Sequence, residues 1–145
     1  MTEDRTAIHL DQYLAHPPAK VWRALTEPEL VARWLMPNTF KPEVGHAFTF
    51  TTDPVAATGF DGVVHCEVLE LEPERLLRIS WRGGSAADWT VTWRLVPEGR
   101  GTRLLLDHEG FDPDDPAQQL SRKIMGGGWR GRVMAGIERT LAELH

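Results

Sequence analysis

Apolar and polar residues alternate from the start of the chain. In residues 6–14, Ile8, Leu10 and Leu14 share one parity, and mostly polar residues occupy the other. This period of two predicts a β-strand with one buried face. Two short helices are predicted next, the first opening at Pro17-Pro18 and the second at Pro28, because proline is tolerated in the first turn of a helix.

The period of two returns over the middle of the chain. Five segments alternate in this way, and glycine- and proline-containing turns separate most of them: 46–51, 62–71, 77–82, 89–95 and 104–109. Strands at hairpin spacing predict an antiparallel meander with one apolar face. Five aromatic residues share the apolar parity of their strands and are expected on its concave face: Phe48, Phe50, Trp81, Trp89 and Trp93.

The last segment has helical spacing. Trp129, Val133, Ile137, Leu141 and Leu144 recur every three or four residues and form one apolar face. The residues upstream point along another azimuth, so a bend or a break is expected near 126–128, where three glycines follow one another. This helix is the only predicted element large enough to cover the sheet, which gives an α+β fold in a single domain, 1–145.

Composition narrows the class of protein. The chain has 145 residues, of which 41% are hydrophobic, and it has no long uncharged apolar run, so no membrane association is expected. A net charge of −5 argues against nucleic-acid binding. One cysteine, Cys66, and a charged N-terminus predict a cytoplasmic protein without disulfides. Cys66 is expected to be a small buried apolar residue.

Catalytic and cofactor motifs are absent from the sequence. It has no glycine-rich phosphate loop, no paired cysteines, no His-x-x-x-His and no nucleophile elbow. We therefore expect no metal and no cofactor, and we assign no catalytic residue.

Several segments resemble one known family. The opening HPPAKVWRALTEPELVARW, the stretch from Gly62 to Trp81, GTRLLLDHEGF and the final GGGWRGRVMAGIERTLAEL are similar to START-like domains of the SRPBCC superfamily, and most closely to the group named after the activator of the Hsp-90 ATPase. The resemblance implies a helix-grip (START-like or Bet v-like) fold. In such a fold a curved antiparallel sheet of about six strands wraps a long C-terminal helix and leaves a cavity between them.

The concave face has two interpretations. Its aromatic rings either fill a core or form the wall of a cavity for an apolar ligand. The five glycines of the last helix, at 126, 127, 128, 131 and 136, are compatible with close helix–sheet approach or with room for a ligand. Eight residues are predicted to bind such a ligand: Phe48, Phe50, Trp81, Trp93, His108, Trp129, Arg130 and Val133.

Two of these residues are polar. His108 shares the parity of Leu104 and Leu106, so it is either a hydrogen-bonded core residue or a polar fixture for a ligand; His46 has the same alternatives. Arg130 falls by helical rotation inside the apolar arc of the last helix. Its stem either carries the charge out to water, or the guanidinium pairs with an acidic group, which would favour acidic ligands.

The sequence therefore predicts that a monomer or homodimer binds a small, largely apolar molecule, and aromatic, polyketide-like and acidic ligands all fit this prediction. One alternative is a cyclase or dehydratase, which would need a titratable pair in the cavity, such as His108 with His46 or either with Arg130. A second alternative, a co-chaperone, is implied by the family name. The eukaryotic activators carry an additional upstream domain, and the chain is expected to lack it.

Overall fold

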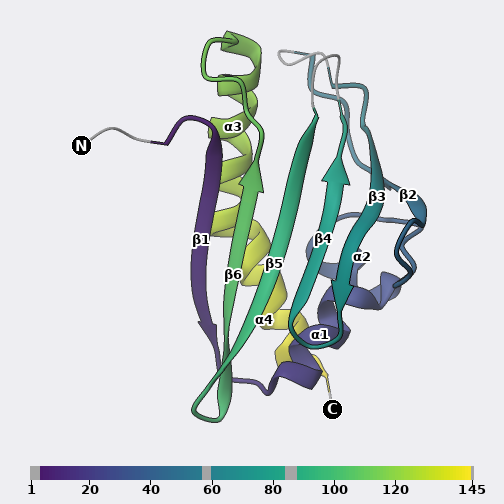
Figure 1. Cartoon of the computed structure of the whole chain (residues 1–145), viewed down its shortest axis with the longest axis vertical. Coiled ribbons are helices and arrows are strands. Elements are labelled where there is room, and N and C mark those ends of the chain that lie inside the picture. Colours follow the sequence, from purple (N-terminus) through teal and green to yellow (C-terminus); the bar gives the residue numbers. More distant parts are fainter. Residues whose placement is uncertain (1–3, 57–59, 84–87, 145) are drawn as a thin grey trace.

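A six-stranded antiparallel sheet forms one layer of the protein (Figure 1). The computed structural model describes residues 4–56, 60–83 and 88–144. The strands are β1 (Ala7–Leu14), β2 (Ala47–Thr51), β3 (Val63–Glu72), β4 (Leu76–Trp81), β5 (Trp89–Glu98) and β6 (Gly101–Glu109). Their order in the sheet is β1-β6-β5-β4-β3-β2, so the predicted five-strand meander is confirmed and β1 adds to its β6 edge.

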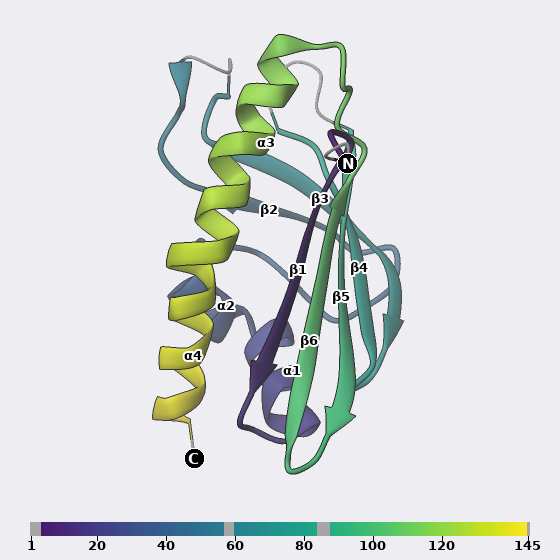
Figure 2. The ribbon, with the colours of Figure 1, turned by 90° about the vertical axis from the view of Figure 1, so that its left-hand side faces the viewer.

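The second layer is the C-terminal helix, which crosses one face of the sheet (Figure 2). It runs without a break through α3 (Pro116–Gly128), η2 (Trp129–Val133) and α4 (Met134–Glu143). Asp115 caps its start, since the side chain accepts a hydrogen bond from the backbone N–H of Ala117 at 2.9 Å. A bend or break was expected near residues 126–128; the helix instead has a π-helical turn, which begins at Trp129, directly after the three glycines.

Two short helices, α1 (Pro18–Thr26) and α2 (Pro28–Trp34), follow β1 as predicted. They lie at the α4 end of the long helix and pack against it (Figure 1). None of the described helices is long and apolar enough to span a membrane.

The core lies between the sheet and the helices. The predicted parity is confirmed on the central strands: Trp81, Trp89 and Trp93 are at most 4% exposed, and Phe48 and Phe50 are equally buried. Cys66 is buried on β3, and desolvation raises the pKa of its thiol, which therefore stays protonated and unreactive. The architecture is the α+β helix-grip fold that the sequence predicts.

Candidate ligand cavity

The space between the sheet and the C-terminal helix is filled at the α4 end. Trp93 packs its ring edge-to-face against Trp34 and Trp129, with centroid distances of 6.3 and 6.2 Å. Trp129 also touches Trp81, at 6.1 Å. A void of about 10 Å³ lies beside Trp93, which is at the lower limit for holding one water molecule. These rings form a core.

The filled end is closed by α1 and α2. Trp34 anchors α2 to α1, because its indole N–H donates a hydrogen bond to the carbonyl of Ala24 at 2.7 Å. The helix α4 then packs directly on α2, and a Cβ at Gly136 would lie 3.1 Å from Cβ of Trp34. Five residues of α4 are buried in consequence: Met134, Gly136, Ile137, Thr140 and Leu141.

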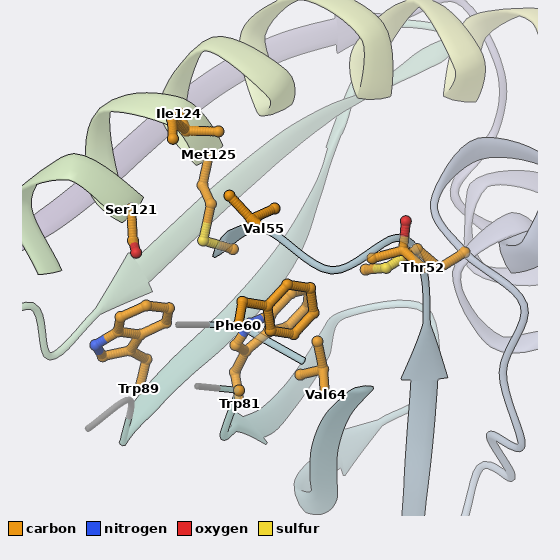
Figure 3. A pocket seen from close by; sticks show the side chains of 11 residues that line it. Thr52, Val55, Phe60, Val64, Trp81, Trp89, Ser121, Ile124 and Met125 are labelled. Carbon is orange, nitrogen blue, oxygen red and sulfur yellow. The ribbon is translucent and has the colours of Figure 1, made fainter. Parts of the chain in front are cut away.

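At the other end, under α3, the layers separate around a cavity of about 210 Å³ (Figure 3). Its wall on the sheet side comes from β3, β4 and β5, its roof from α3, and its remaining side from Met36, Thr52, Val55 and Phe60. The lining residues are Met36, Thr52, Val55, Phe60, Val64, Trp81, Gly83, Trp89, Ser121, Ile124 and Met125.

The segment after β2 is folded against the sheet. Thr52 donates its backbone N–H to the carbonyl of Gly62 at 2.8 Å, and Gly62 has a φ of +95°, where a Cβ would collide with the Thr52 carbonyl. Only glycine fits this approach. Further along, Val55 and Phe60 form an antiparallel bridge and present both side chains to the cavity. Phe60 lies over Gly83, where a Cβ would come within 3.0 Å of its ring.

The helix α3 is held by polar contacts on the β1 side of the cavity. Arg122 donates from Nε to the carbonyl of Ala7 at 3.0 Å, and the side-chain amide of Gln119 donates to the carbonyl of Arg5 at 2.7 Å. The indole N–H of Trp89 donates to Gln118 at 3.2 Å. These bonds fix α3, of whose described residues only Gly126 is buried, while Met125 packs partly buried against the core.

The chemistry of the cavity is apolar and aromatic. None of the described lining residues is titratable, and the side-chain oxygens that line it belong to Thr52 and Ser121. Figure 3 shows the Ser121 hydroxyl directed toward Trp89 and the Met125 thioether reaching down from α3. A cavity of about 150 Å³ lined by apolar side chains binds benzene, so this volume suits a molecule of roughly one or two rings.

His108 lies behind the cavity wall and is completely buried. Its Nδ1 accepts a hydrogen bond from the indole N–H of Trp129 at 3.1 Å, which leaves its proton on Nε2. Among the described residues Nε2 has no hydrogen-bond partner; aromatic rings surround the imidazole, with Phe111 at 4.8 Å and Trp81 and Trp89 at 5.4 Å. Burial lowers its pKa from 6.5 to about 3, so the ring is neutral.

The His46–His108 pair, one of the titratable pairs that a cyclase could use, is not assembled. His46 lies just before β2, and its Nε2 donates to the carbonyl of Thr39 at 3.0 Å. Because β5, β4 and β3 separate β6 from β2, His46 and His108 lie at different places in the sheet.

The prediction that Arg130 lies in the buried arc of the helix is wrong. Arg130 is exposed, and its guanidinium lies over Gly126, where a Cβ would be 3.0 Å from Nη1 and 3.9 Å from Ile8. The π turn explains the error. It has more residues per turn than an α-helix, so each residue rotates less about the helix axis, and Arg130 is left at the edge of the apolar face.

Of the eight residues predicted from sequence, Trp81 alone lines the cavity. Phe48, Phe50 and Trp93 border the small void, Trp129 and His108 are buried in the core, and Val133 is half-buried against it.

Sequence reasoning missed Val55 and Phe60, two apolar residues in a segment without periodicity. It also missed the inward side chains of α3. The glycines of the helix do not make the cavity; Gly126 accommodates Arg130, and Gly136 permits close contact with α2.

Comparisons with known proteins agree with this architecture. The model of the family described as "Activator of Hsp90 ATPase homolog 1-like protein" matches residues 15–142. The crystal structure of MLL2253 from Mesorhizobium loti has 33% sequence identity and a TM-score of 0.84, and the match covers 96% of this chain and 98% of that one. CalU16 from Micromonospora echinospora has 26% identity and a TM-score of 0.75, with 94% and 76% covered.

A third structure is DynU16, described as a protein in the dynemicin biosynthetic locus. It has 22% identity and a TM-score of 0.77, over 97% of this chain and 48% of that one, which shows a shared fold. Comparison with curated proteins finds no significant match.

Proposed function

The chain belongs to the activator of Hsp90 ATPase homolog 1-like family, and from that premise we propose that it binds a small, largely apolar molecule in the cavity under α3. The observation that carries the proposal is the cavity itself, about 210 Å³ of space walled by tryptophan, phenylalanine, valine and methionine side chains. Ligand pockets are typically apolar and aromatic, with a few polar groups that fix orientation. Ser121 and Thr52 would supply those groups here.

Binding is favoured over catalysis by the composition of the wall. A cyclase or dehydratase needs at least one group that can take or give a proton at the substrate. The described lining residues include no acid, no histidine and no lysine, and the neutral His108 accepts its one hydrogen bond from Trp129, a core residue.

Titration with 1-naphthaleneacetamide, a neutral two-ring probe, tests the proposal. Calorimetry and quenching of tryptophan fluorescence should both report saturable binding, because Trp81 and Trp89 form the wall that the probe would contact. Ser121→Phe places a ring in the cavity and should weaken the binding at least tenfold. The matched control is Lys123→Phe, an exposed position on the same helix that does not line the cavity.

Two results would contradict the proposal. One is the absence of saturable binding to the unaltered protein by this probe and by a panel of one- and two-ring neutral aromatics. The other is equal binding by the Ser121→Phe and Lys123→Phe variants, which would place the probe elsewhere on the protein.

A further inference from the structure

A second hollow adjoins the apolar cavity. It is a groove of about 280 Å³ between α2 and the η2–α4 part of the long helix, and it shares Met36 and Thr52 with the apolar cavity. Its lining residues are Ala32, Arg33, Trp34, Leu35, Met36, Pro37, Thr52, Arg132, Gly136 and Arg139. In Figure 3, Thr52 lies at the end of the cavity away from Trp89, and the helix passes over both.

The groove is positively charged. Three of its lining residues are arginines, and no acidic residue is among those described as lining it. Arg33 forms an ion pair with Glu143. Within the described part of the chain, Arg132 and Arg139 have no acidic partner. In a chain of net charge −5, two unneutralised guanidiniums beside one groove make a local site of the opposite sign.

The backbone sets the shape of the groove. Gly136 lies between the two arginines along the helix. Its lack of a side chain lets α4 pack on Trp34, because a Cβ at Gly136 would lie 3.1 Å from Cβ of Trp34. Arg132 and Arg139 therefore flank the point of closest contact. Arg132 is the nearer of the two to the cavity, because it follows the lining residue Met125 by seven residues and Arg139 follows it by fourteen.

We infer that the ligand carries an anionic head group, a carboxylate or a phosphate, which binds Arg132 and Arg139 while its apolar body occupies the cavity. This inference rests on the proposed function and adds the class of ligand to it. Arginine suits such a head group, because its planar guanidinium donates two parallel hydrogen bonds to two oxygens of an anion. Met36 and Thr52 would lie beside the link between body and head.

The spacing between the two sites predicts the length of that link. Met125, in the roof of the cavity, precedes Arg132 by seven residues, which is roughly 10 Å along the helix at 1.5 Å per residue. A ligand with several bonds between its rings and its anionic group should therefore bind more tightly than one with the acid directly on the ring.

The test compares acids with matched neutral amides. The probes are 1-naphthaleneacetate and its homologues with two to four methylene groups before the carboxylate, each paired with its primary amide, titrated by calorimetry at low and high salt. The acids should bind more tightly than their amides, and the difference should shrink with added salt, which screens exposed charges. In the double variant Arg132→Gln/Arg139→Gln the acids should lose roughly three- to tenfold in affinity, since exposed ion pairs are individually weak. The amides should be unaffected.

Arg130→Gln is the matched control, because it removes one exposed arginine of the same helix that lies over Gly126 and not in the groove. Equal binding of acids and amides, or an acid preference that survives the double variant, would overturn the inference and leave the proposed function standing. A loss of acid affinity in Arg130→Gln equal to that in the double variant would also overturn it. If neither acids nor amides bind, the proposed function itself fails.

Discussion

The two ends of the helix–sheet interface are built from similar residues and packed differently. Trp93 and Trp81 occupy the same parity of neighbouring strands and are equally buried by their neighbours. Over Trp93 the long helix contributes the ring of Trp129, and a void of about 10 Å³ lies beside Trp93. Beside Trp81 and Trp89 the helix contributes Ser121 and Met125, which line the cavity of about 210 Å³.

The difference lies in what holds the helix at each end. At the α4 end, α1 and α2 close the side of the sandwich, so apolar side chains bring the layers into contact. At the α3 end, Arg122 and Gln119 attach the helix to backbone carbonyls near β1, and these hydrogen bonds hold it in place while Leu120 stays exposed and Met125 is only partly buried. Ile124 stays 50% exposed at the cavity mouth. A cavity can therefore persist because polar contacts replace the apolar packing that would otherwise close it.

Truncating one methionine at each end of the long helix should give the largest difference in stability between the two ends. Met134 and Met125 lie on the same helix, but Met134 is buried at 6% exposure and Met125 borders the cavity. Met134→Ala should lower the free energy of unfolding by about 2–5 kcal/mol, because it leaves a new void in a packed region. Met125→Ala should cost less than about 1 kcal/mol, since its side chain already has fewer packing partners. Urea denaturation of both variants measures the two values, and equal losses would mean that the α3 end is packed as tightly as the α4 end.

The features that local sequence patterns determine could be predicted, and the features that depend on the packing of distant segments could not. The strands, their inward faces and the order of helices follow from local periodicity, and the concave position of Trp81, Trp89 and Trp93 was predicted correctly. The cavity was not located, because its position depends on the separation of α3 from the sheet, which no local pattern encodes. Val55 and Phe60 enter it from a segment without periodicity.

The arginines of the long helix show the same limit of local patterns. The rotation per residue of an ideal α-helix predicts Arg130 inside the apolar arc, but the π turn changes this rotation and Arg130 lies at the surface. The arginines that do border a hollow, Arg132 and Arg139, carry no sequence signal that separates them from other surface arginines. Their position becomes evident only when α2 is packed beside α4.

The pH dependence of stability tests whether the core is closed at His108, which lies between the filled end and the cavity wall. Burial lowers its pKa from 6.5 to about 3, so between these values the unfolded chain binds a proton that the folded chain does not. The contribution of His108 to stability is therefore complete above about pH 6.5 and is lost as the pH falls. From pH 7 to pH 4.5 the loss should be about 2.5 kcal/mol, at 1.36 kcal/mol per unit of pH.

Chemical denaturation of the unaltered protein and of His108→Leu at several pH values isolates this effect, because other groups titrate equally in both proteins. His9→Gln is the control of opposite sign. A hydrogen bond to Asp107 raises the pKa of His9, so its contribution is present at low pH and is lost as the pH rises through the folded-state pKa. A His108→Leu profile parallel to that of the unaltered protein between pH 7 and pH 4.5 would show that His108 is accessible to protons in the folded state.

The smallest expected effect is at two glycines of the long helix, one at each end of the interface. A Cβ at Gly127, in α3, would meet no atom within 4 Å outside its own stretch of helix, so Gly127→Ala should raise the free energy of unfolding by up to about 1 kcal/mol through helix propensity alone. A Cβ at Gly136, in α4, would lie 3.1 and 3.2 Å from Cβ and Cα of Trp34. Backbone atoms cannot move aside easily, so Gly136→Ala should force α4 away from α2, and the strain should outweigh the gain in propensity and lower stability by about 1 kcal/mol. Thermal and urea denaturation of the two variants give the signs directly. If Gly136→Ala is as stabilising as Gly127→Ala, then α4 does not rest on α2, and the close packing that distinguishes the filled end from the cavity end would be refuted.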